Sequence, residues 1–197
     1  MLKINIKKAK SDEKFKKSIQ NYLSIMERID NTKFDNDFKK DYCTFYRINP
    51  HRDDKWKNVY FNTFNKYRKL RVKNNKLSIK GILEEVLLEL YKKVDKVELS
   101  FVSKMLHSLY PKKCPIYDSV VAKQLNLSKR KFNGEKKIHN DCEIYDDLVK
   151  KIKEQRYLVK EYNSIFDDSS ELRRVSDIKK IDFLIWWYGK KQLKKNK

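Results

Sequence analysis

The stretch that decides the fold is SIKGILEEVLLELYKKVDKVELSFVSKMLHSLY, residues 78–110. It opens on Ser78, a preferred helix N-cap, and two series of apolar residues at helical spacing follow. The first series is Ile79, Ile82, Leu83, Val86, Leu87 and Leu90, and the second is Leu99, Val102, Met105, Leu106 and Leu109. This pattern predicts two consecutive helices at the centre of the hydrophobic core.

The same periodicity extends along the rest of the chain. The other predicted helices are 12–29, 35–48, 53–71, one capped by Asp118, 143–162 and one capped by Ser176. The lysine-rich stretch 128–141 is predicted to be a basic loop. No alternation of apolar and polar residues is long enough for a sheet, so the fold class is all-α.

We therefore expect a compact multi-helix protein of one domain over residues 1–197. If the chain forms two small lobes, the boundary is expected near 73–78. The lysine-rich tail over 191–197 is expected to fray.

The chain carries 48 Lys and Arg against 27 Asp and Glu, a formal net charge of +21. Such a charge favours polyanions, because each phosphate neutralised by a basic side chain releases counterions. Nucleic acid is the obvious class of partner. However, Lys outnumbers Arg 39 to 9, the mixture that AT-rich codons produce without any ligand. Both interpretations stand at this point.

The cysteines and the apolar segments bear on the cellular compartment. Cys43, Cys114 and Cys142 are odd in number, far apart and without a C-x-x-C pair, which argues for reduced thiols. The N-terminus has no apolar stretch typical of a signal peptide, and no segment approaches the roughly 20 apolar residues that span a bilayer. We expect a cytoplasmic protein without a membrane partner.

Several enzyme signatures are absent from the sequence. There is no P-loop, no G-x-G-x-x-G and no H-E-x-x-H, and His51, His107 and His139 lack the spacing of metal ligands. We expect no cofactor and no metal. For His107 we favour a polar group satisfied within a helix interface.

Aromatic and basic residues alternate over 53–71, beginning with Trp56. Aromatic rings stack on unpaired bases while nearby cations hold phosphates, so Trp56 is a candidate nucleic-acid contact. The commoner meaning of such an aromatic stripe is core packing.

Near the C-terminus, the adjacent Trp186 and Trp187 cannot face the same way on a helix, so one is expected to be partly exposed.

Three blocks resemble a group of uncharacterised bacterial proteins. They are SFVSKMLH (100–107), PIYDSVV (115–121) and SDIKKIDFLIW (176–186), and the likeness covers roughly residues 75 to 190. That group has no settled function to carry over to this chain.

The central blocks are also similar, more distantly, to the helix-hairpin-helix DNA glycosylases, in which a helix, a loop and a proline precede a V-D-T-x-V-type helix start. This resemblance implies a two-lobed helical fold and a catalytic role for Asp118. Two features depart from the pattern: 92–98, KKVDKVE, replaces the glycine-rich hairpin, and Ser100 stands where the nucleophilic lysine is expected. Lys104, one helical turn further along, is the residue that can substitute.

The candidate catalytic residues are therefore Asp118 and Lys104. Candidate nucleic-acid contacts are Tyr117, Ser119, Lys123, Lys129, Arg130, Lys131 and Trp56. The candidates for the walls of a base pocket beside Asp118 are Tyr117, Trp56, Trp186 and Trp187, of which we favour Tyr117. The competing role for Asp118 is a plain N-cap, worth about 1 kcal/mol to the helix that follows.

Three functions remain open. The first is a monofunctional DNA N-glycosylase-like hydrolase, acting on DNA rather than RNA, that uses Asp118 on a base flipped out of the stack. The second is a non-catalytic nucleic-acid-binding protein on the same scaffold, such as a regulator or a component of a defence or mobile element. The third is a protein-interaction module whose charge reflects codon bias, which predicts no salt-dependent affinity for nucleic acid.

Overall fold

Helix α6 (Leu99–Leu109) lies at the centre of the fold, with every residue except Ser100 buried. We describe a computed structural model over residues 2, 4–31, 34–48, 52–73, 78–96, 98–129, 132–166 and 169–195. A helix that is buried all round needs neighbours on every side. The rest of the chain supplies them.

The described residues form helices and no strand, which confirms the all-α prediction. The remaining elements are α1 (Ile6–Lys10), α2 (Glu13–Asn31), α3 (Asn36–Phe45), α4 (Asp54–Lys73), α5 (Ile79–Val94), α7 (Ser119–Gln124), α8 (Gly134–Glu154), α9 (Leu158–Asn163), the 3₁₀ helix η2 (Glu171–Arg174) and α10 (Asp177–Lys195). No helix in these ranges combines the length and apolar character needed to cross a membrane.

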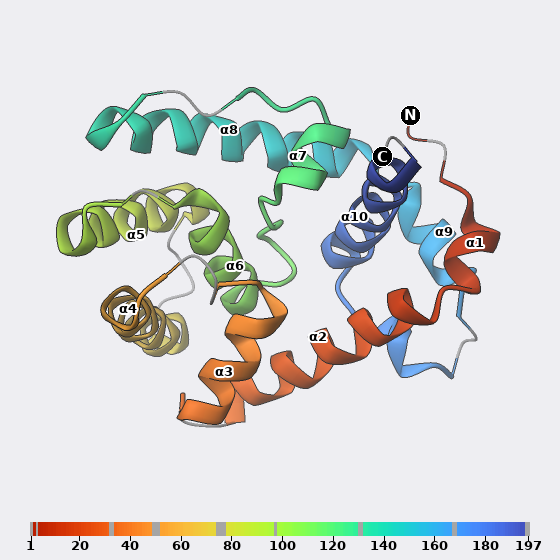
Figure 1. The fold of residues 1–197 in the computed structure, drawn as a ribbon, viewed down its shortest axis with the longest axis horizontal. Helices are drawn as coiled ribbons and strands as arrows, with labels where there is room; N and C mark the ends of the chain where they lie inside the picture. Colours follow the sequence, from red (N-terminus) through yellow and green to blue (C-terminus); the bar gives the residue numbers. More distant parts are fainter. Residues whose placement is uncertain are drawn as a thin grey trace.

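The helices gather on two sides of α6 (Figure 1). On one side, α4 and α5 pack against each other and against α6, and α8 runs along α5. On the other side, α10 packs against α7 and α9, while α2 crosses the molecule and contacts α3, α6 and η2. The N-terminal and C-terminal helices therefore share one side of the fold.

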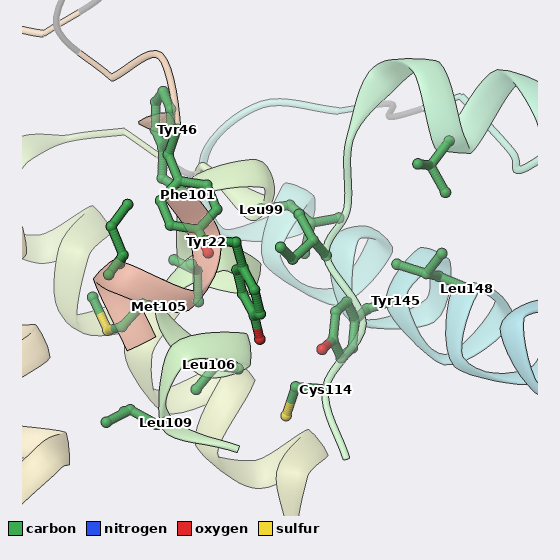
Figure 2. Close-up of a cluster of buried hydrophobic side chains, with 14 of the residues drawn as sticks. Tyr22, Tyr46, Leu99, Phe101, Met105, Leu106, Leu109, Cys114, Tyr145 and Leu148 are labelled. Carbon is green, nitrogen blue, oxygen red and sulfur yellow. The ribbon is translucent and has the colours of Figure 1, made fainter. Parts of the chain in front are cut away.

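Side chains from distant helices converge on α6 (Figure 2). Phe101 and Met105 of α6 lie in a cluster with Tyr22 of α2 and Tyr145 of α8. The hydroxyl of Tyr145 donates to the carbonyl of Pro115 at 3.0 Å, which fixes the loop between α6 and α7 against α8. The core thus positions the segment that leads to Asp118.

His107 is fully buried on α6 and bonds through both ring nitrogens. Its Nδ1 lies 2.6 Å from the carbonyl of Cys114, which can only accept, so Nδ1 carries the proton. Nε2 therefore accepts from the hydroxyl of Tyr22 at 2.8 Å. This confirms the prediction of a satisfied polar group in a helix interface, and burial lowers the pKa of His107 to about 3.

Helix caps match the prediction at two decisive positions. The Ser78 hydroxyl accepts from the Gly81 N–H at 3.0 Å, and the Asp118 carboxylate accepts from the Val120 N–H at 2.8 Å. Between α5 and α6 the turn forms without glycine, because Asp95 adopts the left-handed conformation with φ 50°. The three cysteines are buried and form no disulfide, as predicted.

Two predicted segments are wrong. The stretch 128–141 is not a loop throughout, because α8 begins at Gly134 and buries Ile138. The helix predicted over 143–162 is interrupted after Glu154, where a turn at 155–157 redirects the chain so that α9 packs against α10.

Two further expectations concern the C-terminal tail and the lobe boundary. Helix α10 continues to Lys195, Lys191 pairs with Asp12 at 2.7 Å, and residues 196–197 lie outside the described ranges. At the lobe boundary expected near 73–78, the flanking helices α4 and α5 pack against each other, and residues 74–77 lie outside the described ranges.

The close packing of α7 on α10 depends on Gly189. A Cβ atom at this position would lie 2.5 Å from Cγ1 of Val120, closer than real contacts allow. Gly189→Ala is therefore expected to destabilise the protein by about 1–3 kcal/mol in denaturant unfolding, because α7 must shift. At an open helical site the same change stabilises by about 1 kcal/mol, so a stabilised variant would contradict this packing. Lys194→Ala, exposed on the same helix, is the control.

Candidate functional site

One cavity of about 460 Å³ lies between α2 and the end of α3 on one wall and α7 and α10 on the other. Helix α6 contributes Lys104, and the loop after it contributes Ile116 and Asp118. The remaining lining residues are Ser18, Asn21, Thr44, Phe45, Tyr46, Arg47, Ser119, Val120, Lys179, Asp182, Phe183, Trp186 and Lys190. Residues from all three sequence blocks, 100–107, 115–121 and 176–186, therefore meet at this cavity.

Asp118 is held at the cavity by the start of α7. Its Oδ1 atom caps the helix, and the preceding residue is fixed because the Tyr117 N–H donates to the Ser103 hydroxyl at 2.9 Å. The side chain is half-buried. Capping occupies one carboxylate oxygen and leaves the second, Oδ2, without a donor among the described residues.

Lys104 is a buried base on the cavity wall, 8% exposed. Its Nζ donates to the carbonyl of Tyr46 at 3.2 Å and to the hydroxyl of Ser100 at 3.1 Å. Burial lowers the pKa of Lys104 to about 8, although the negative charge of Asp118 acts to raise it. An amine with this pKa exchanges its proton near neutral pH, as proton-transfer groups must.

Sequence reasoning missed a second acid and a second base in the cavity, Asp182 and Lys179 of α10. Both are 4% exposed, and the Nζ of Lys179 lies 2.6 Å from Oδ2 of Asp182. The other oxygen, Oδ1, is shielded from solvent and accepts no hydrogen bond from the described residues. Burial raises the pKa of the Asp182 carboxyl. The available signal was the i, i+3 spacing of these two residues in the block 176–186.

Arg47 lines the cavity from the end of α3 and was also missed. The Ile48 N–H donates to the Cys43 carbonyl at 2.8 Å, and the Arg47 N–H donates to the Thr44 carbonyl at 3.3 Å. This is the Schellman arrangement, whose left-handed position is usually glycine. Arg47 takes that position with φ 55°, and its side chain is exposed.

Aromatic rings form part of the wall, and Trp186 is the one candidate wall residue among them, whereas the favoured Tyr117 is not. Tyr46, Phe183 and Trp186 line the cavity, whereas the half-buried Tyr117 does not. Trp187 is buried, and its Nε1 donates to Asp12 at 2.8 Å. The prediction that one of the two adjacent tryptophans is partly exposed is confirmed by Trp186.

Trp56 is a core residue, and its prediction as a nucleic-acid contact is wrong. It is 2% exposed and stacks on Tyr60, with ring centroids 5.0 Å apart. The guanidinium of Arg52 also lies over the ring, 5.3 Å from its centroid. A base has no surface on which to stack there.

The other predicted contacts are distributed around this site. Ser119 lines the cavity, whereas Lys123 and Lys129 are exposed and outside its lining. Arg130 and Lys131 lie outside the described residues. Away from the cavity, two adjoining hollows between α3 and α4 share Lys39 and Phe61. Their further basic residues are Lys40, Lys57, Arg68 and Lys69.

Within the described ranges, no three His, Cys, Asp or Glu side chains are grouped as metal ligands. A comparison with protein-family models, curated protein sequences and solved structures finds no match to this chain. Function must therefore be argued from the cavity itself.

Proposed function

We propose that this protein binds nucleic acid, DNA in preference to RNA, and cleaves the N-glycosidic bond of a nucleotide flipped into the cavity. The observation that carries the proposal is that Asp118 and Lys104, the two residues selected from the sequence as catalytic, line the same cavity. They come from different elements, α6 and the N-cap of α7.

The cavity suits a flipped nucleotide in size and chemistry. Its volume of about 460 Å³ lies within the roughly 300–1,000 Å³ of small-molecule sites. Aromatic side chains offer surfaces for a base, and the lining holds four basic residues against two carboxylates. The Oδ1 atom of Asp182 offers an unused acceptor for an N–H group of the base.

The two candidate residues divide the chemistry between them. When the C1′–N bond breaks, its electron pair leaves with the base, and the base takes up a proton, which the Lys104 ammonium supplies. Positive charge develops on the sugar, and the Asp118 carboxylate stabilises it. Water then adds to C1′ and releases a proton, which the Asp118 carboxylate accepts.

A specific observation favours the alternative of a non-catalytic nucleic-acid-binding protein. Asp118 makes the 2.8 Å capping bond to Val120, which by itself accounts for an aspartate at this position. On this alternative, the basic lining binds nucleic acid while no bond is cleaved.

The variant Asp118→Asn separates the two, because asparagine is an equally good N-cap but carries no charge. We expect it to keep the unfolding midpoint and the affinity for DNA and to lose base release by at least about a hundredfold. The assay incubates both proteins with duplex and single-stranded oligonucleotides that carry damaged or modified bases and scores abasic sites. Equal binding with no base released from any substrate would favour the non-catalytic protein. The absence of any salt-dependent affinity for nucleic acid would favour a protein-interaction module.

A further inference from the structure

Arg47 stands where the backbone favours glycine. A left-handed residue at the end of a helix strains any side chain with a Cβ, and glycine relieves that strain. Arg47 accepts the strain with φ 55°. The side chain is exposed, so it contributes little to core packing. An observed strained residue beside a cavity points to a role for its side chain in function.

Arg47 and Lys190 also differ from the other two basic residues of the cavity. Lys104 bonds to Tyr46 and Ser100, and Lys179 pairs with Asp182. Arg47 lines the cavity from the end of α3, and Lys190 lines it from α10. Among the described residues, no carboxylate lies within ion-pair distance of either of these two. Their charge is therefore available to a ligand.

We infer that Arg47 anchors a phosphate group of the nucleic-acid strand whose base enters the cavity. The inference rests on the proposed function for the nature of the strand. A guanidinium presents paired N–H donors that match two phosphate oxygens, a geometry that lysine lacks. Lys190, whose Nζ lies 5.7 Å from the ring centroid of Trp186, adds a second positive charge beside an aromatic surface. The unpaired charges of Arg47 and Lys190 favour a phosphate group at the rim of the cavity, and the aromatic lining favours the base within it.

The variant Arg47→Gly tests this inference without endangering the fold, because glycine suits the left-handed position better than arginine does. We expect its melting temperature to equal or exceed that of the wild type. The probe is a short fluorescein-labelled single-stranded DNA, titrated by fluorescence anisotropy at several salt concentrations. Loss of one phosphate contact should weaken binding several-fold and make the slope of log affinity against log salt shallower by about 0.7.

The control is Arg156→Ala, which removes the same charge from an exposed turn outside the cavity. Weaker binding and a shallower slope in Arg47→Gly, with an unchanged control, support the phosphate contact. If Arg47→Gly binds with the affinity and the salt slope of the wild type, the phosphate contact is overturned. Base release by the wild type then remains a separate question. An equal loss in both variants also overturns it, because the charge would then act non-specifically. Absence of salt-dependent binding by the wild type overturns both this inference and the proposed function.

Discussion

Lys179→Met is expected to destabilise the protein by about 3–5 kcal/mol, because it leaves the carboxylate of Asp182 buried without its partner. Lys179 and Asp182 are each 4% exposed, and their charged atoms lie 2.6 Å apart. Methionine keeps a long apolar side chain but removes the charge, including the contact of Nζ with the Phe183 ring, whose centroid lies 4.3 Å away. Denaturant unfolding at pH 7 measures the loss. The double variant Lys179→Met/Asp182→Leu should recover most of it, since replacing both charges with apolar groups removes the unpaired carboxylate.

The matched control is Lys16→Met, which breaks the pair with Glu13 at the same i, i+3 spacing on the surface of α2. Its cost should stay within about 1 kcal/mol, as for other exposed pairs.

Burial already raises the pKa of Asp182, and loss of Lys179 raises it further, so the native state then binds a proton more readily than the unfolded chain. The loss in Lys179→Met should therefore shrink as pH falls from 7 to 5. An undiminished loss at pH 5, with no recovery in the double variant, would show that the charge of Asp182 is not the cause.

Much of the fold could be predicted because local signals and core packing agree. Ser78 and Asp118 cap helices in both the prediction and the structure, and the apolar spacing of 99–109 marks the central helix. The prediction failed where the signals were weaker. The apolar face of α8 already includes Ile138, but the glycine and lysines before it are typical of a loop. Tertiary packing decided that boundary.

The candidate site could be predicted only in part. Asp118 and Lys104 were selected from a resemblance confined to the centre of the chain, and the cavity contains both. Lys179 and Asp182 lie in the block 176–186, yet nothing in the sequence says which face of α10 lines the cavity. Arg47 depends on a backbone angle that the sequence does not reveal. Trp56 is the opposite case, a residue that was predicted as a contact but lies in the core. An aromatic stripe is typical both of a core and of a base-stacking surface, and only the burial of the side chain distinguishes the two.

His107 is expected to make the protein sensitive to mild acid. In the folded protein, burial lowers its pKa to about 3 from the ordinary value of 6.5, so between these values the unfolded chain binds a proton that the native state does not. Stability contributed by the neutral imidazole is therefore fully present above pH 6.5 and is lost as pH falls. Since one pKa unit corresponds to about 1.4 kcal/mol and the unfolded imidazole is half protonated at pH 6.5, the loss between pH 6.5 and 4.5 is about 2 kcal/mol.

The variant His107→Asn isolates this effect, because its amide can still donate to the Cys114 carbonyl but does not titrate. We expect the variant to be less stable than the wild type at pH 7 by about 1–3 kcal/mol, since the Tyr22 hydroxyl loses its acceptor. The difference should narrow as pH falls, because only the wild type loses the contribution of the imidazole. Denaturant unfolding at pH 7, 5.5 and 4.5 measures both trends.

Carboxylates titrate in the wild type and in the variant alike, including Asp182, whose pKa burial raises, so the difference between the two proteins isolates His107. For Asp12, the Lys191 and Trp187 hydrogen bonds outweigh burial and lower its pKa to about 2, so its contribution is lost only below about pH 4. The exposed His139 provides the control variant His139→Asn, which should retain the pH dependence of the wild type. If His107→Asn and the wild type lose stability in parallel from pH 7 to 4.5, the buried imidazole is not the group that links folding to protonation. The hydrogen bonds of His107 would then matter for packing alone.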